Sequence, residues 1–388
     1  MEKIRIGDAC ELLNGFAFKS ENYVKEGIRI IRIANVQKGY IEDNTPAFYP
    51  ADSEGLDKYM LEENDLLMSL TGNVGRVAIL QKDMLPAALN QRVACLRLKT
   101  DRITKGYLFH LLNSDFFEQK CIQSSKGVAQ KNMSTEWLKD FLIPVYSVEK
   151  QQEITTTLDN LRDIINKRKQ ELNKLDDLIK ARFVELFGDC RLNPKGWKTV
   201  PLGDIAEVGS SKRVFVEELK EAGIPFYRGT EVGALAEGKK VIPELFITEE
   251  HYDELVKATG KPEPGDLLMP SICPDGRIWV VDTDKPFYFK DGRVLWIHGI
   301  DTRFDPVFLL YTLKDRIMTD YGSIASGTTF AELKIFALKQ CQVFDVPIEE
   351  QRSFAAFIAQ VDKSKVAVQK SLDETQLLFN SLMQKYFG

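Results

Sequence analysis

The chain repeats itself at a spacing of about two hundred residues, and this duplication limits its fold more than any other feature. The recurring landmarks are DLLM at residues 65 and 266, GR at 75 and 276, RV at 92 and 293, and FG at 187 and 387. The landmarks keep their order through small insertions. A chain of 388 residues built in this way is predicted to hold two similar domains.

Each copy begins with an irregular pattern and ends with a helical one. The first part has short β-branched and aromatic runs separated by Gly, Pro, Asn and Asp, which is typical of a mixed α/β domain. No Gly or Pro occurs in residues 148–187 or 348–387, so each of these segments is predicted to be one long helix. The predicted fold class is α+β, with two pseudo-symmetric mixed α/β domains separated by two long helices.

Apolar residues in the two predicted helices recur in alternating steps of three and four, which is typical of a coiled coil. The stripe consists of Leu158, Leu161, Ile165, Leu172, Leu175 and Ile179 in the first helix, and of Ile358, Val361, Val368, Leu372 and Phe379 in the second. A surface helix packed on its own domain carries a similar stripe, so that alternative stays open. We favour pairing of the helices because the stripe is shared by both copies.

The connectivity makes this pairing antiparallel, with one domain at each end of the helix pair, like a two-fold dimer fused into one chain. The predicted segments are domain 1 at residues 1–146, the first helix at 147–187, a linker at 188–196, domain 2 at 197–346 and the second helix at 347–388.

Two similar domains on a stiff spacer fit a ligand that is read at two points, and double-stranded DNA is the natural candidate. A helix over residues 151–187 spans ~55 Å, and dimeric DNA readers place their recognition elements ~34–36 Å apart or at multiples of that distance. Because the copies have diverged, we expect an asymmetric bipartite target with an unread gap.

The net charge of −5 argues mildly against a DNA partner, but the charge is unevenly distributed. Residues 67–139 carry 11 basic and 5 acidic residues (11 − 5 = +6), and residues 267–340 carry 9 of each (9 − 9 = 0). Residues 1–66 and 197–266 are both net negative. Positive charge therefore gathers in the later half of each domain, where we expect phosphate contacts. Ordinary patchiness of a solvated surface is the alternative.

The candidate DNA-binding residues fall into two groups. Arg76, Arg92, Arg277 and Arg293 recur in register, so they suit phosphate contact or domain scaffolding rather than reading of bases that differ between the half-sites. Base reading is expected from Gly-centred loops that differ between the copies, although ordinary surface turns look the same. The candidates in these loops are Lys126, Lys131, Asn132, Thr328 and Thr329.

No catalytic or metal-binding motif is found. There is no G-x-G run, no Pro-Pro dipeptide and no C-x-x-C pair, and the three histidines share no metal spacing. Methyl transfer would therefore need a partner. No apolar run approaches the ~18 residues of a membrane-spanning helix, and no signal peptide is evident, so a cytoplasmic protein is expected.

The chain resembles the specificity subunits of type I restriction-modification systems over its whole length. The resemblance rests on the duplication and on three runs, namely GWKTVPLGDI at 196–205, GTTFAELK at 327–334 and VPIEEQ at 346–351. The first copy keeps Glu149 and Gln151 of the last run but has Ser147 in place of its proline.

This resemblance implies two target recognition domains, each reading half of a bipartite site, and conserved helices that form an antiparallel coiled coil. It also implies two methyltransferase subunits and motor-nuclease restriction subunits as partners. S-adenosylmethionine, ATP and magnesium would be bound by those partners and not by this chain. On this basis the two helices serve as spacer and as docking surface.

Two other functions stay open at this point. One is a coiled-coil scaffold that joins protein partners without reading DNA. The other is a stand-alone nuclease or methyltransferase whose site has an unfamiliar pattern.

Overall fold

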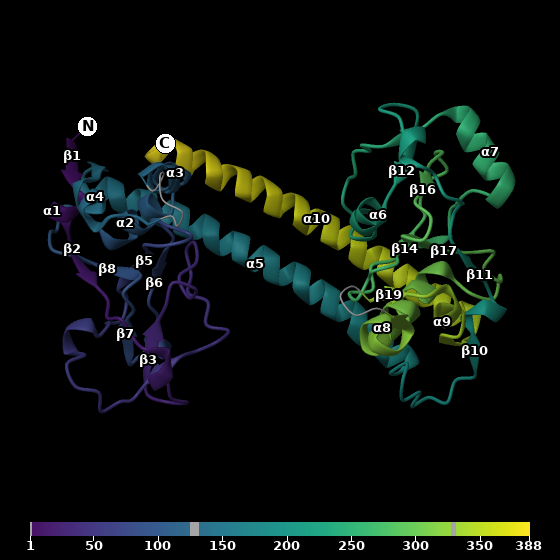
Figure 1. Cartoon of the computed structure of the whole chain (residues 1–388), viewed down its shortest axis with the longest axis horizontal. Coiled ribbons are helices and arrows are strands. Elements are labelled where there is room, and N and C mark those ends of the chain that lie inside the picture. Colours follow the sequence, from purple (N-terminus) through teal and green to yellow (C-terminus); the bar gives the residue numbers. More distant parts are fainter. Residues whose placement is uncertain (1, 125–131, 327–330) are drawn as a thin grey trace. The chain divides into compact units, whose positions relative to one another are not determined.

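The computed structural model describes residues 2–124, 132–326 and 331–388 (Figure 1). It divides into two compact units, which we call unit 1 (residues 1–171 and 368–388) and unit 2 (residues 172–367). The two long helices are α5 (Val148–Phe187) and α10 (Ile348–Phe387). Each unit therefore contains one α/β domain and one part of each long helix.

Unit 1 is built on three small sheets. The four-stranded sheet is antiparallel, in the order β2 (Cys10–Asn14), β8 (Val93–Leu98), β5 (Leu66–Ser69) and β6 (Val77–Ile79). In the second sheet, β3 (Ile28–Ile31) pairs antiparallel with β4 (Phe48–Tyr49) and parallel with β7 (Ala87–Leu89). The third is an antiparallel ribbon of β1 (Glu2–Arg5) and β9 (Leu142–Val145). The shorter helices are α1 (Ile6–Ala9), α2 (Lys105–Leu112), α3 (Asp115–Ser124) and α4 (Thr135–Asp140), with 3-10 turns at Ser20–Asn22, Asp57–Tyr59 and Lys82–Met84.

Unit 2 repeats the three sheets of unit 1. Its four-stranded sheet runs β11 (Glu207–Gly209), β17 (Val294–His298), β14 (Leu267–Pro270) and β15 (Trp279–Val280), all antiparallel. In the second sheet β12 (Ile224–Tyr227) pairs antiparallel with β13 (Phe246–Ile247) and parallel with β16 (Tyr288–Phe289). The ribbon joins β10 (Thr199–Pro201) and β20 (Gln342–Phe344), and a further pair joins β18 (Ala325–Ser326) and β19 (Glu332–Leu333).

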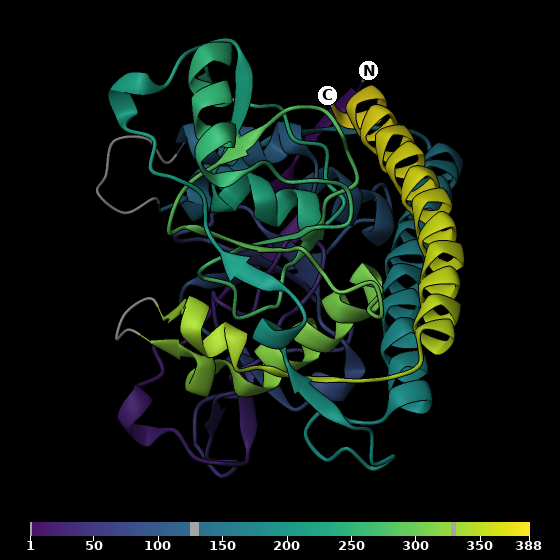
Figure 2. The same cartoon turned by 90° about the vertical axis from the view of Figure 1, so that its right-hand side faces the viewer.

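The shorter helices of unit 2 are α6 (Gly229–Ala236), α7 (Glu249–Thr259), α8 (Pro306–Ile324) and α9 (Ile335–Lys339). Its 3-10 turns are Leu202–Asp204 and Val216–Glu218. The coarse fold prediction is thereby confirmed: the chain holds two mixed α/β domains and two long helices. Figure 2 gives a second view of the same elements. No helix in the described ranges is both long and apolar enough to cross a membrane.

The repeated DLLM run forms the central strand of each four-stranded sheet. Leu66 lies opposite Leu96 in unit 1, and Leu267 lies opposite Ile297 in unit 2, so the pairing keeps the same register. The Leu and Met side chains of both runs are almost fully buried, because both faces of the strand are covered. The repeated sequence therefore forms strands that pair in the same register in both units.

The Asp that opens each DLLM run closes the turn before the strand. Asp65 accepts a hydrogen bond from the Glu62 backbone N–H at 2.8 Å, and Asp266 accepts one from the Glu263 N–H at 2.9 Å. Arg97 binds the Asp65 carboxylate through two nitrogens, whereas the one side-chain donor to Asp266 within the described ranges is the indole N–H of Trp296. Burial accordingly raises the pKa of Asp266 above its ordinary value.

A buried glutamine ties the first turn of each long helix to its domain. Gln151 accepts a hydrogen bond from the Thr104 N–H at 2.8 Å and donates to the carbonyls of Arg102 and Tyr146 at 2.8 and 2.9 Å. Both this side chain and its counterpart Gln351 are fully buried.

Gln351 makes the same three bonds in unit 2. It accepts from the Asp305 N–H at 2.8 Å and donates to the carbonyls of Arg303 and Val346 at 3.0 and 2.7 Å. Since each amide satisfies three backbone groups that would otherwise be buried without partners, it fixes how the helix leaves its domain.

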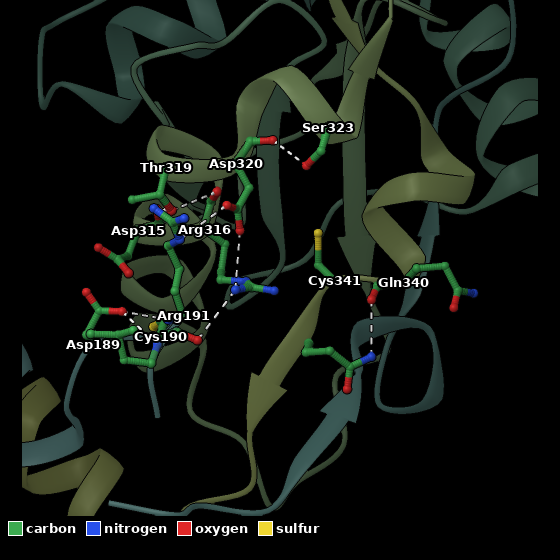
Figure 3. A network of polar contacts seen from close by, with 12 residues as sticks. Asp189, Cys190, Arg191, Asp315, Arg316, Thr319, Asp320, Ser323, Gln340 and Cys341 are labelled. Carbon is green, nitrogen blue, oxygen red and sulfur yellow. Dashed lines mark hydrogen bonds and ion pairs between the residues drawn. The ribbon is translucent and has the colours of Figure 1, made fainter. Parts of the chain in front are cut away.

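Within unit 2, the segment that follows α5 is hydrogen-bonded to α8 (Figure 3). The Asp189 carboxylate accepts from the Arg191 and Leu192 N–H groups at 2.8 and 3.0 Å. Arg316 of α8 donates to the Cys190 carbonyl at 3.4 Å and pairs with Asp320 at 3.3 Å. This segment therefore fixes α5 to α8.

The predicted apolar stripe is buried or half-buried at every position in both helices. The sequence analysis missed the aromatic residues that pack where the helices meet the domains. In unit 2, Phe183 and Phe187 of α5 lie 5.5 Å from the Phe354 ring of α10, centroid to centroid. In unit 1, the Phe387 ring of α10 lies 5.4 Å from the Tyr107 ring.

Candidate nucleic-acid interface

Three segments that carry predicted DNA-binding residues meet at one edge of unit 1. The Leu70 N–H donates to the Arg92 carbonyl at 3.0 Å, and the Met133 N–H donates to the Leu70 carbonyl at 2.8 Å. An isolated β-bridge joins Thr71 to Asn132. The structure therefore brings Arg92 and Asn132 onto neighbouring backbone segments.

The same three segments meet in unit 2. The Ser271 N–H donates to the Arg293 carbonyl at 2.9 Å, and the Leu333 N–H donates to the Ser271 carbonyl at 2.8 Å. We call this feature the three-segment edge. It comprises residues 70–76, 92–93 and 132–133 in unit 1, and residues 271–277, 293–294 and 332–333 in unit 2.

The repeated Gly-Arg pair ends the turn of each edge. Gly75 has φ +81° and Gly276 has φ +64°, a left-handed region that favours glycine. A Cβ on Gly75 would lie 2.8 Å from the Cys121 sulfur, and one on Gly276 would lie 2.9 Å from Lys314 Cγ. Glycine is therefore needed at both positions, and it sets the start of the strand that follows.

The arginines next to these glycines have different partners in the two units. Arg76 is half-buried and donates to the side-chain oxygen of Gln37, a neutral amide. Arg277 lies 2.8 Å from an Asp275 oxygen and 3.8 Å from Glu237. The hydrogen bond with Asp275 raises the pKa of Arg277. Burial works to raise the pKa of Asp275, but the hydrogen bond and the charge of Arg277, together with hydrogen bonds from the Asp275 backbone and Cys273, leave that pKa lowered.

Arg92 and Arg293 differ in the same way. Both are exposed, but Arg293 forms an ion pair with Glu332, while no carboxylate within the described ranges lies at ion-pair distance from Arg92. Backbone hydrogen bonds bring about this contact. Leu333, which follows Glu332, is hydrogen-bonded to Ser271, and Ser271 is hydrogen-bonded to Arg293. Both arginines of unit 2 are thus neutralised locally, in line with the weaker positive charge of residues 267–340.

Part of the predicted set lies outside the described residues. Lys126, Lys131, Thr328 and Thr329 fall in the gaps between the described ranges, so their roles stay predictions. Asn132 is described and exposed. The sequence analysis missed Gln37, Asp275 and Glu332, because no local pattern tells which side chain an arginine will meet.

A cavity of about 610 Å³ lies in unit 1 between α2, α3, α5 and α10. Lys38 at its wall binds Asp115 at 2.8 Å and Glu118 at 2.7 Å. Burial works to lower the pKa of Lys38, but these hydrogen bonds outweigh it and raise that pKa. At the other wall, the His110 ring nitrogen lies 2.9 Å from an Asp159 oxygen.

Most charged groups that line this cavity have an ion-pair partner, either in the lining or next to it. The hydrogen bond with His110 holds the pKa of Asp159 below its ordinary value. The hydroxyl of Ser114, which lines the same cavity, donates to the Leu111 carbonyl at 2.6 Å and not to His110. Across the described part of the chain, no group of three or more His, Cys, Asp or Glu residues could hold a metal ion.

Comparison with known proteins gives a consistent answer. The family described as "Type I restriction modification DNA specificity domain" matches residues 1–174 and 194–375. The type I restriction enzyme EcoBI specificity subunit of Escherichia coli is 29% identical over 414 residues, which cover 98% of this chain and 83% of that protein.

Other curated matches are partial. The MjaVIII specificity subunit of Methanocaldococcus jannaschii is 30% identical over 183 residues, which are 45% of this chain and 43% of that protein. The EcoAI specificity subunit of Escherichia coli is 32% identical over 173 residues, 43% of this chain and 29% of that protein. The chain thus spans less than half the length of these two relatives.

Solved structures share the fold. The S subunit of a type I restriction-modification system from M. genitalium has a TM-score of 0.60 at 16% identity, covering 100% of this chain and 96% of that one. A chain from work on complex assembly and conformational transition of the type I R-M system has a TM-score of 0.58 at 18% identity, covering 100% of this chain and 97% of that one.

Proposed function

We propose a function from the premise that this chain belongs to the type I restriction-modification DNA specificity family. The chain reads an asymmetric bipartite DNA target and directs its partner subunits to that target. The partners are two methyltransferase subunits and motor-nuclease restriction subunits. The chain itself performs no catalysis, and S-adenosylmethionine, ATP and magnesium are bound by the partner subunits.

The observation that carries this proposal is the duplicated three-segment edge. Arg92 and Arg293 stand at the same backbone position of the edge, while the side chains around them differ. The same backbone arrangement with different neighbouring side chains suits a target whose two halves are contacted in the same way but differ in sequence. The repeated arginines would bind phosphates, and base reading is assigned to Asn132 and to the loops of Lys126, Lys131, Thr328 and Thr329.

The long helices would pair as an antiparallel coiled coil that sets the gap of the target. In unit 1, Leu158 near the start of α5 shares a core with Phe387 at the end of α10. In unit 2, Phe183 near the end of α5 shares a core with Phe354 near the start of α10. This opposite order is what antiparallel pairing requires, and an ion pair at 2.8 Å between Lys365 and Asp176 supports it.

The outer faces of the helices would serve as docking surface for the methyltransferase subunits. Large apolar side chains are exposed there, although a solvated helix face is normally polar. They are Ile164, Leu178 and Val184 on α5, and Val366, Leu377 and Leu378 on α10. A scaffold without DNA reading would use the same surface, so DNA binding has to be tested separately.

Removing two arginines of unit 1 tests the DNA-reading proposal. In the chain assembled with its methyltransferase subunits, the double variant Arg76→Ala/Arg92→Ala is expected to bind duplex DNA more weakly. The slope of log affinity against log salt should become less steep by about 2, since each lost phosphate contact contributes about 0.9. The measurement is DNA affinity by fluorescence anisotropy over a series of salt concentrations.

The matched control is Arg303→Ala, which removes an exposed arginine that pairs with Asp301 within its own turn. It should leave the slope unchanged. Unaltered binding and slope in the double variant would show that Arg76 and Arg92 are scaffolding. Failure of the unmodified assembly to bind any duplex would favour the scaffold function.

A further inference from the structure

One difference between the two three-segment edges determines whether a neighbouring arginine has a carboxylate partner. Met133 and Leu333 make the same backbone bond within their edges, so the residues before them, Asn132 and Glu332, are equivalent. Unit 1 therefore has a neutral amide where unit 2 has a carboxylate. Arg92 and Arg293 are equivalent too, and of these two only Arg293 has a carboxylate partner within the described ranges.

Glu332 is held in place for this contact. It lies on β19, whose neighbour Leu333 is buried and bonded to Ser271. Its side chain is 28% exposed, compared with 56% for Arg293, and its other oxygen lies 3.4 Å from Lys334. The carboxylate thus extends from a strand to a guanidinium that is largely exposed to solvent.

We propose that Glu332 competes with DNA phosphate for Arg293 and thereby limits binding of unit 2 to non-target DNA. This inference rests on the proposed function. In the free protein and in non-target complexes, Arg293 stays with Glu332. When the base contacts of unit 2 are satisfied, DNA is held close enough for Arg293 to exchange the carboxylate for a phosphate.

The strength of the ion pair suits such an exchange. A pair between exposed groups is worth little, so a phosphate held by other contacts can displace it. A transient contact between Arg293 and a phosphate of non-target DNA contributes less binding free energy, because breaking the ion pair with Glu332 offsets part of it. Phosphate contacts supply most of the sequence-independent affinity, so unit 2 holds non-target DNA less strongly than it would without Glu332.

Neutralising the carboxylate tests the proposal. In the assembly with methyltransferase subunits, Glu332→Gln is expected to bind a random-sequence duplex roughly two- to fivefold more tightly, the range that corresponds to an exposed ion pair. The salt slope should become steeper by about 1 as one phosphate contact is gained. Affinity for a duplex that carries the target sequence should rise at least as much, because breaking the ion pair costs free energy in the target complex of the unmodified chain.

A control and a double variant separate this role from a change of net charge. Asp301→Asn removes a carboxylate from another exposed arginine pair of unit 2 and should leave the affinity for the random-sequence duplex and its salt slope unchanged. In an Arg293→Ala background, Glu332→Gln should have no further effect, because Glu332 is proposed to act through Arg293. An equal effect in both backgrounds would overturn the proposal.

The reciprocal variant installs the carboxylate in unit 1. Asn132→Glu should pair with Arg92, lower affinity for the random-sequence duplex and flatten the salt slope by about 1. Unchanged slopes in Glu332→Gln, with intact binding of the target by the unmodified assembly, would refute the role of Glu332 while leaving the proposed function standing. If the unmodified assembly fails to bind its target, the proposed function itself fails.

Discussion

Exchanging residues 1–146 for the corresponding domain of another specificity subunit is expected to change one half of the methylated DNA target and to leave the other half unchanged. Unit 2 is formed by residues 172–367, so its three-segment edge contains no exchanged residue. The gap should also stay the same, because both long helices are retained. The measurement is the methylated motif in cells that carry the exchanged gene together with the methyltransferase gene.

The exchanged domain has to keep its contacts with the helices. Gln151 needs the backbone groups of residues 102, 104 and 146, and the Phe387 ring needs an aromatic partner at Tyr107. The matched control exchanges residues 197–346 and should alter the opposite half of the target. A change in both halves after either exchange would contradict the assignment of one half-site to each domain.

Replacing Phe354 by Ala is expected to lower the free energy of unfolding by about 3–5 kcal/mol, the usual cost of removing a buried phenyl ring. Phe354 is fully buried, with the rings of Phe187 and Tyr311 at centroid distances of 5.5 and 5.4 Å. The cavity left behind would loosen the contact between the start of α10, the end of α5 and α8. Urea unfolding of the full chain measures the effect.

The matched control is Phe336→Ala on α9. Phe336 is 76% exposed, so its loss should change the free energy of unfolding by no more than about 0.5 kcal/mol. The two units can unfold in separate transitions. The lower free energy of unfolding of Phe354→Ala should then appear in the transition assigned to unit 2. Equal effects of the two variants would contradict the packing of α10 described above.

The duplication was the most informative feature of the sequence, because the repeated runs form strands with the same pairing register in both units. The DLLM runs occupy equivalent buried strands, where a shift of one residue would turn every side chain to the opposite face. The absence of Gly and Pro correctly predicted both long helices. The three-four spacing did not single out Phe183 or Phe354, since their burial also depends on α8, which is remote in sequence.

The candidate interface could be predicted only in part. Repetition in register pointed to Arg92 and Arg293, and the structure places them at equivalent edges. Their different charge environments were not evident, because Glu332 lies 39 residues from Arg293 and meets it only through the backbone ladder. The 200-residue spacing of the repeat already aligns Asn132 with Glu332, but it does not show that this position lies beside the arginine of the edge.

The most direct test of the central claim is a genome-wide map of adenine methylation in the source strain, with and without this gene. Reading of a bipartite target predicts that deletion removes one two-part motif methylated on both strands, and that the gene restored in trans brings it back. An unchanged set of methylated motifs, in cells that express the methyltransferase partner, would contradict the account.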